Sequence, residues 1–155
     1  MTKTPKGGKS LEPVDLRLSE GDLLWLAGII EGEGSIGLDR RPATKYEVST
    51  SPPAPYLCIT MTDKDVVDRI GLLLNTKTRL LNRKTTAGKS EYRVRAGRRQ
   101  TLIHLFPLLL PHMGIRRKDK MQEAIDALDA WKVWYANGGR SQMSKRGYDA
   151  SLGKK

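Results

Sequence analysis

An apolar helix is the feature of this sequence that most constrains its fold. Residues 23–30 form the longest uninterrupted apolar run in the chain. Ser19 and Asp22 precede this run with the spacing of a capping box, in which each side chain binds the backbone N–H of the other residue. The pattern predicts a helix over about 20–32. Because the run is far shorter than the roughly 20 apolar residues of a membrane-spanning helix, no membrane span is expected.

The end of this predicted helix combines small and acidic residues. Gly28 and Gly32 are four residues apart and share one face, where the missing side chains permit close approach of a second helix. Since each glycine costs a helix roughly 0.5–1 kcal/mol relative to alanine, we expect a packing reason for both. Glu31 and Glu33 lie where the helix dipole disfavours carboxylates, so a compensating cation such as a hard divalent ion is expected nearby. Two solvent-exposed acids without a partner are the alternative.

The rest of the chain predicts a small mixed domain. Apolar spacing, proline and glycine predict strands at 35–39, 56–61, 77–83 and 91–96. A helix is expected after a capping pattern at 62–65, another over 100–110 with an interruption or kink at Pro107, and a last one over 118–135. Two strand pairs, each associated with a helix, indicate the α+β class with a four-stranded antiparallel sheet. A single domain is expected over 14–137, between a flexible basic arm at 1–13 and a polar basic tail at 138–155.

Composition excludes several classes of protein. A chain of 155 residues is expected to form one domain, and its single cysteine, Cys58, excludes an intrachain disulfide framework and a cysteine-rich zinc site. The first ten residues are basic but no apolar segment adjoins them, so we expect an intracellular protein rather than a secreted one. We expect neither membrane attachment nor a small-molecule substrate.

Positive charge gathers on the predicted strands. The 28 Lys and Arg residues against 17 Asp and Glu give a formal net charge of +11, and residues 40–100 carry fourteen basic and five acidic side chains. Strand alternation places arginines on the sheet face opposite the apolar one, and a β-ribbon of this kind fits the major groove of DNA. The candidate DNA-binding residues are Arg41, Lys45, Arg79, Arg83, Arg93 and Arg95. A solvated basic surface, or attraction to anionic lipid, is the alternative interpretation of this charge.

Residues 26–34 read LAGIIEGEG, and this segment resembles the signature of the LAGLIDADG homing endonuclease family. It differs from that signature by Ile for Leu, Glu for each Asp and Gly for Ala. The following Ser35-Ile36 opens a strand, residues 57–63 are similar to the family's second strand, and residues 109–118 are similar to the approach to its late helix. The resemblance covers about residues 18–135 and implies the family's αββαββα fold with a saddle-shaped sheet.

The resemblance also implies an activity, which is metal-dependent, sequence-specific double-strand cleavage of DNA. A chain with one motif would act as a homodimer whose motif helices pack together. The implied interface residues are Leu24, Ala27, Gly28, Glu31 and Gly32. Glu33 of each copy would bind a divalent metal, Mg²⁺ or Mn²⁺, at the centre of the DNA site. Arg116, Arg117 and Lys118 are candidates for a basic residue beside it, with Arg116 and Lys118 assigned to the catalytic set.

One departure from the family pattern bears on cleavage. Family sites often place a polar residue, commonly Gln, at the end of the second strand. This chain has Thr60-Met61-Thr62 there, and Met61 cannot position a water as an amide can. The alternative is therefore a cleavage-deficient DNA- or RNA-binding protein of the same fold, such as a regulator or a splicing cofactor. A small basic RNA-binding protein with a fortuitous motif is a third hypothesis.

Overall fold

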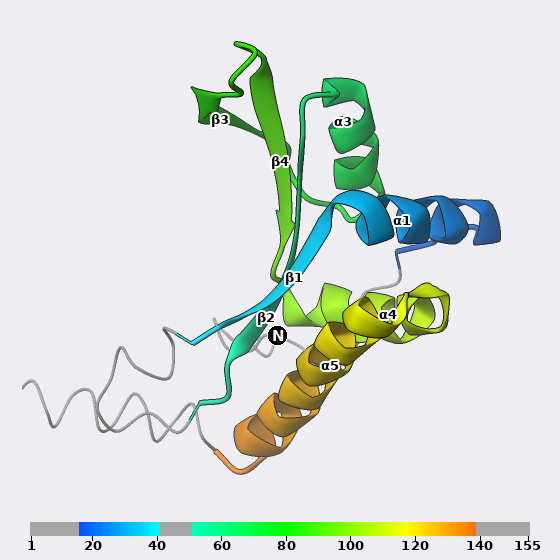
Figure 1. Ribbon diagram of the computed structural model, residues 1–155. Helices are drawn as coiled ribbons and strands as arrows, with labels where there is room; N and C mark the ends of the chain where they lie inside the picture. Colours follow the sequence, from blue (N-terminus) through cyan, green and yellow to red (C-terminus); the bar gives the residue numbers. More distant parts are fainter. Residues whose placement is uncertain (1–15, 41–50, 139–155) are drawn as a thin grey trace, which may run out of the picture.

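Four helices lie on one side of a four-stranded antiparallel sheet in the described part of the chain (Figure 1). The computed structural model describes residues 16–40 and 51–138. In chain order the elements are α1 (Glu20–Glu33), β1 (Gly34–Asp39), β2 (Ala54–Met61), α3 (Lys64–Leu73), β3 (Arg79–Lys84), β4 (Ser90–Ala96), α4 (Arg99–Leu109), a 3₁₀ turn η1 (Leu110–His112) and α5 (Ile115–Ala136). This order confirms the predicted α+β class and its antiparallel sheet.

Helix α1 runs directly into strand β1 with no connecting loop. At its start, Ser19 Oγ accepts a hydrogen bond from the Asp22 N–H at 3.0 Å and the Asp22 carboxylate accepts one from the Ser19 N–H, so the predicted capping box is present. At its end, Gly34 donates its N–H to the Ile30 carbonyl, and a Cβ atom at Gly34 would lie 2.8 Å from the Ile30 backbone. Only glycine fits this junction, which holds Glu33 at the border of the sheet.

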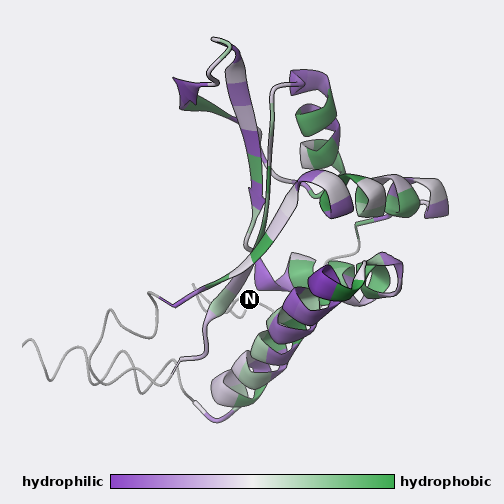
Figure 2. Ribbon diagram, in the orientation of Figure 1, coloured by the Kyte–Doolittle hydropathy of each residue, from purple (hydrophilic) through white to green (hydrophobic). Residues whose placement is uncertain are grey.

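The strand order is β1-β2-β4-β3, so β1 and β3 form the two edges. Ile36 of β1 pairs with Leu57 of β2, and Ile59 of β2 pairs with Val94 of β4. Because residues directly opposite one another share a face, these apolar pairs define the face that the helices cover. Figure 2 shows hydrophobic residues, in green, along the helices that pack on this face.

The hydrophobic core fills the space between this face and the helices. Leu26 and Ile30 of α1 are fully buried there, as is Phe106 of α4. The other fully buried large side chains are Leu57, Ile59, Val67, Ile70, Leu74, Leu102, Leu105, Leu109 and Met121. Every helix therefore contributes to a single core, and the opposite face of the sheet is left for polar and charged side chains.

Three local predictions were wrong. Helix α3 has Asp63 as its N-cap and this side chain makes no capping hydrogen bond, so the pattern at 62–65 is not a capping box. Pro107 lies inside α4, which continues to Leu109 without interruption because its buried apolar face outweighs the lost backbone hydrogen bond. Helix α5 starts at Ile115, earlier than the predicted 118, with Gly114 as its N-cap.

Several predictions concern residues outside the described part of the chain. The expected basic arm at 1–13, nearly all of the expected tail at 138–155, and the candidate DNA-binding residues Arg41 and Lys45 fall there. Within the described ranges, no helix is both long enough and apolar enough to cross a membrane.

Replacing Phe106 with Ala should lower the free energy of unfolding by about 3–5 kcal/mol, because the cavity would lie at the centre of the core. Urea denaturation followed by circular dichroism measures the change. The control is Leu72→Ala on α3, whose side chain is 85% exposed and should change stability by no more than about 0.5 kcal/mol. Equal effects of the two substitutions would contradict this description of the core.

Candidate nucleic-acid interface

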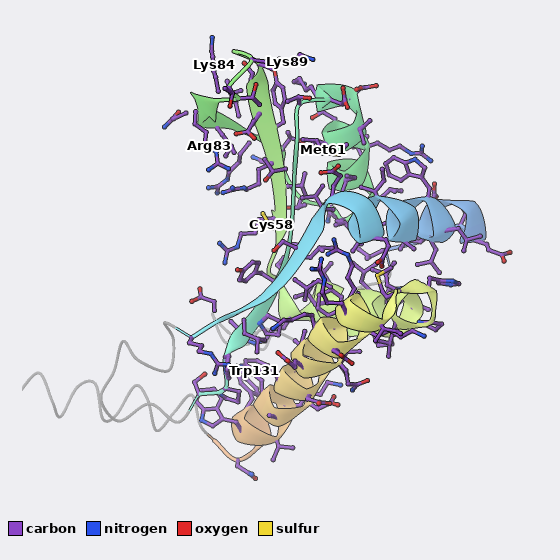
Figure 3. The ribbon with its side chains drawn as sticks, viewed as in Figure 1. Cys58, Met61, Arg83, Lys84, Lys89 and Trp131 are labelled. Atoms are coloured by element: carbon purple, nitrogen blue, oxygen red, sulfur yellow. The ribbon has the colours of Figure 1, made fainter. Side chains whose placement is uncertain are left out.

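The open face of the sheet, on the side away from the helices, carries the predicted arginines. Arg95 pairs with Cys58 and Arg93 pairs with Thr60, which places all four residues on the face opposite the core. Arg79 lies directly opposite Arg93 on the neighbouring strand. Figure 3 shows Cys58 and the side chain of Arg83 on this side of the sheet. The four described arginines predicted to bind DNA therefore lie on one surface.

The arginines of this face differ in what restrains them. Arg83 Nε lies 2.9 Å from the Glu91 carboxylate, and Arg93 Nε donates to Thr60 Oγ1 at 3.1 Å. Arg79 is exposed, and like charges directly opposite one another destabilise a sheet unless an anion lies between them. The Arg79–Arg93 pair is thus a place where a polyanion would stabilise the protein.

Two lysines add positive charge at the tip of the hairpin that carries Arg79, Arg83, Arg93 and Arg95. Lys84 ends β3 and Lys89 precedes β4, and both are exposed on the hairpin between these strands (Figure 3). The only acidic side chain of this hairpin, Glu91, is already paired with Arg83. The sequence signalled these lysines through the excess of basic residues over 76–100.

Glu33 lies at the border between α1 and this open face. It is exposed, and it directly precedes Gly34, which pairs with Ile59. Glu33 ends α1 at the residue before β1, and Ile59, the partner of Gly34, directly precedes Thr60, which pairs with Arg93. The end of α1 thus adjoins the end of β2 where Thr60 contacts Arg93, and we call Glu33, Thr60 and Arg93 the acid–arginine row.

The concern about Met61 rested on the wrong face of the sheet. Met61 pairs with Tyr92 and packs against the hydrophobic core, whereas the polar side chain at the end of β2 on the open face is Thr60. The sequence held the signal, because alternation from the apolar residues Leu57 and Ile59 assigns Met61 to their face. Met61 therefore says nothing about cleavage.

Glu31 is bound within its own chain. Its carboxylate accepts a hydrogen bond from the Gly114 N–H at 3.0 Å, at the start of α5, and lies 3.8 Å from Arg117 Nε. Arg117 also donates to the main-chain carbonyls of Glu31, at 2.9 Å, and Gly34. The positive charge expected beside Glu31 is thus supplied by Arg117 and by the N-terminal end of α5.

Arg116 and Lys118 do not meet at one site. Arg116 lines a hollow of about 290 Å³ together with Gly34, Ser35 and Lys120. Lys118 lines a different hollow beside Leu110 and Pro111. Positions two apart on a helix point roughly 200° apart, so only one of the pair can face β1. Lys118 thus lies away from the hollow beside the end of α1, whereas Lys120, one turn after Arg116, lines it.

The exposed face of α1 includes three of the five residues of the predicted interface. Leu24 is 49% exposed, and Gly28 and Gly32 are exposed too, with no atom within 4 Å of a Cβ placed at either glycine. Ala27 is only 5% exposed and belongs to the hydrophobic core with Leu26, so it lies off this exposed face. We call Leu24, Gly28 and Gly32 the glycine face of α1.

The aromatic side chains at the end of α5 form a structural cluster away from the glycine face. Trp131 is 7% exposed, and its ring centroid lies 5.0 Å from that of Tyr135. The Arg99 guanidinium lies 4.3 Å from the centre of the Trp131 ring (Figure 3 marks Trp131). Burial lowers the pKa of Arg99. This arginine supports the junction of α4 and α5.

The described residues of one copy do not gather a set of metal ligands. Among residues 16–40 and 51–138, no group of three His, Cys, Asp or Glu side chains is placed to hold an ion. Glu33 offers one carboxylate at the C-terminal end of a helix, where main-chain carbonyl oxygens also concentrate. An all-oxygen environment of this kind fits a hard divalent cation once further oxygen ligands are supplied from outside the chain.

No protein-family model and no curated protein matches this sequence. Solved structures do match. The homing endonuclease I-CvuI, in complex with its target in the presence of Ca, is 17% identical with a TM-score of 0.51, over 84% of this chain and 80% of that chain. The group I intron-encoded homing endonuclease I-CeuI, complexed with DNA, is 16% identical with a TM-score of 0.54, over 81% and 61%. The I-LtrWI LAGLIDADG homing endonuclease, bound to target DNA, is 19% identical with a TM-score of 0.50, over 91% and 48%.

These similarities confirm the fold that the sequence resemblance implied. This chain spans most of the length of I-CvuI and about half of that of I-LtrWI. At identities below one fifth, the similarity extends to the arrangement of the helices and the sheet.

Replacing Arg117 with Ala should lower the free energy of unfolding by about 1–3 kcal/mol, because it removes hydrogen bonds to two carbonyls and leaves Glu31 without its cation. Urea denaturation measures the loss. The neighbouring Arg116→Ala is the matched control, since Arg116 is exposed and should change stability by no more than about 0.5 kcal/mol. If Arg117→Ala were as stable as this control, the contacts of Arg117 with Glu31 and Gly34 would not contribute to stability.

Proposed function

We propose that this chain, which has the fold of the LAGLIDADG homing endonucleases, is a divalent-metal-dependent endonuclease that cleaves a specific DNA sequence as a homodimer. The acid–arginine row of Glu33, Thr60 and Arg93 is the observation that carries this proposal. It joins an exposed carboxylate at the end of α1 to a cationic sheet face. A phosphodiester bound at the border of that face would lie beside Glu33.

Binding of double-stranded DNA is supported by the form and charge of the open face. Arginine forks suit phosphate oxygens as well as guanine edges, and a two-stranded ribbon such as β3–β4 fits the major groove. The unpaired guanidinium of Arg79 and the exposed Lys84 and Lys89 would contact the phosphate backbone, while the side chains in the middle of the sheet would face the bases. Such binding is expected to weaken steeply with salt.

A homodimer is supported by the glycine face of α1. Gly28 and Gly32 lower the stability of an isolated helix, and no residue of the described ranges outside this helix packs against them. A second copy of α1 could approach closely there, with Leu24 adding apolar area. Packing two copies of α1 in this way would bring two Glu33 side chains to the same place, each next to its own sheet.

The chemistry would be shared between the two copies. Mg²⁺ or Mn²⁺, when bound, would supply Lewis-acid stabilisation of the phosphate and of the leaving oxygen. Each Glu33 would hold the ion through its carboxylate, and DNA phosphate oxygens would add the further ligands that a hard cation requires. Arg116 and Lys120, which line the hollow beside Gly34, would offset the negative charge of the phosphate, while Arg117 positions the end of α1.

A cleavage-deficient binding protein is the second candidate function. Thr60 is a short side chain, and its hydroxyl already accepts a hydrogen bond from Arg93, so it is poorly placed to orient a water. A protein of this type would bind DNA or RNA in a salt-sensitive, specific manner and leave it intact in the presence of Mg²⁺ or Mn²⁺.

Replacing Glu33 with Gln should lower the rate of DNA cleavage by roughly 100-fold or more and leave DNA binding in place, because the amide removes the anionic ligand without changing shape. Cleavage of a library of DNA duplexes with Mg²⁺, alongside filter binding, measures both effects. Glu20→Gln, at the opposite end of the same helix, is the control. Undiminished cutting by Glu33→Gln would refute the assignment, and specific binding without cutting by the natural chain would favour the second candidate.

Replacing Gly28 with Leu should convert the dimer to a monomer without unfolding it. A Cβ atom at this position has no described residue outside the adjoining helix backbone within 4 Å, and leucine raises helix propensity by about 1 kcal/mol over glycine. Analytical ultracentrifugation measures the oligomeric state. Ala130→Leu, at an exposed position of α5, should remain dimeric. A dimeric Gly28→Leu variant would show that the copies associate through another surface.

A further inference from the structure

Arg95 is distinguished from the other arginines of the open face by an aromatic support. The carbon at the centre of its guanidinium lies 4.1 Å from the centroid of the Tyr56 ring. Arg95 pairs with Cys58, two residues from Tyr56 on the same strand, so the two are diagonal neighbours on one face. The Arg95 side chain remains 47% exposed. A guanidinium stacked on a ring keeps a fixed plane while its edge stays accessible.

The Tyr56 ring fills the space that a side chain would otherwise take on the neighbouring strand. Gly37 lies directly opposite Tyr56 in the β1–β2 ladder. A Cβ atom at Gly37 would lie 2.5 Å from Cζ of the tyrosine. The ring therefore lies across the backbone of Gly37, and any larger residue there would displace it.

Asp39 restrains the guanidinium from a second direction. Its Oδ2 lies 4.0 Å from Nη2 of Arg95, and its side chain is 19% exposed. At this distance the contact is an ion pair rather than a hydrogen bond, so the N–H donors of Arg95 stay available to a ligand. Tyr56 and Asp39 thus orient the Arg95 guanidinium without occupying all of its hydrogen-bond donors.

We propose that Arg95 recognises a guanine in the major groove, and that Tyr56 and Asp39 are the residues that position it. This inference rests on the proposed DNA-binding function. Guanine presents O6 and N7 on its major-groove edge, and a planar guanidinium can donate to both at once. A bidentate contact of this kind requires a fixed plane, whereas a phosphate accepts a cation from many directions. The nearby carboxylate of Asp39 also weakens the attraction of Arg95 for phosphate and leaves its directional donors in place.

The other arginines of the open face suit other tasks. Arg83 has its Nε bound to Glu91, and Arg93 has its Nε bound to Thr60. Arg79 is exposed and makes no hydrogen bond or ion pair with another described residue, which suits a phosphate contact without base preference. Arg79 is therefore a matched control for Arg95, because both lie on the open face and carry the same charge.

The test compares Arg95→Gln with Arg79→Gln in the full-length protein. Each variant and the natural chain select from a library of DNA duplexes with a randomised segment, and the enrichment of every base at every position is read by sequencing. We expect Arg95→Gln to reduce a preference for guanine by roughly 5- to 150-fold at one position of each half-site. Arg79→Gln should weaken binding to all sequences alike. Arg79→Gln should also lower the slope of log affinity against log salt by about 1 for each copy in the dimer, and Arg95→Gln should lower it less.

Two further substitutions test the positioning of Arg95 without removing its charge. Tyr56→Leu should weaken the guanine preference and leave the salt dependence unchanged, whereas Tyr56→Phe, which keeps the ring, should retain the preference. Gly37→Ala should act like Tyr56→Leu because its methyl group displaces the ring. Thermal unfolding by circular dichroism checks that each variant is folded before selection.

The outcomes separate the inference from the function on which it rests. An unchanged base profile in Arg95→Gln, with a uniform loss of affinity, would make Arg95 a phosphate contact and overturn the proposal. An unchanged profile in folded Tyr56→Leu would overturn the positioning role of the ring. If the natural chain bound no duplex at all, the proposed function would itself be wrong, and the role of Arg95 would fall with it.

Discussion

The junction between α1 and β1 is the constraint on which the candidate site depends. Gly34 allows the helix to become a strand within a single residue, since any Cβ atom there would meet the backbone of Ile30. The exposed face of α1 and the open face of the sheet are therefore joined rigidly, with Glu33 between them. A loop at this point would let the carboxylate move relative to the arginines. The absence of a loop gives the acid–arginine row a fixed geometry.

The two acids at the end of α1 have separate roles that follow from their directions. Glu31 points to the start of α5, where the Gly114 N–H and Arg117 compensate its charge. Glu33 is exposed on the sheet side, where the helix dipole still disfavours a carboxylate. The first acid thus stabilises the fold and leaves the second uncompensated. An uncompensated carboxylate beside a cationic surface is what a metal and a phosphate together would neutralise.

Local patterns in the sequence predicted most of the fold and part of the site. The capping box at Ser19 and the alternation of arginines on β4 involve residues close in sequence, and both were confirmed. The hydrogen bond from Arg117 to the Glu31 carbonyl joins residues 86 apart in the sequence, and no local pattern signals such a contact. Strand pairing also decides which side chains meet across the sheet, so the contact of Arg93 with Thr60 and that of Arg95 with Tyr56 became visible only with the register known.

The basic side chains that give the net charge of +11 therefore differ in how firmly they are oriented as well as in where they lie in the chain. Charges that nothing restrains, such as that of Arg79, act through long-range attraction and are screened by salt. Charges held by an acid or a ring, such as that of Arg95, lose some of this attraction and gain a fixed orientation. Affinity and sequence preference then depend on different arginines of one sheet. Because Glu33 is rigidly joined to that sheet, a base sequence that orients the DNA on the arginines would also decide which phosphate lies beside the carboxylate.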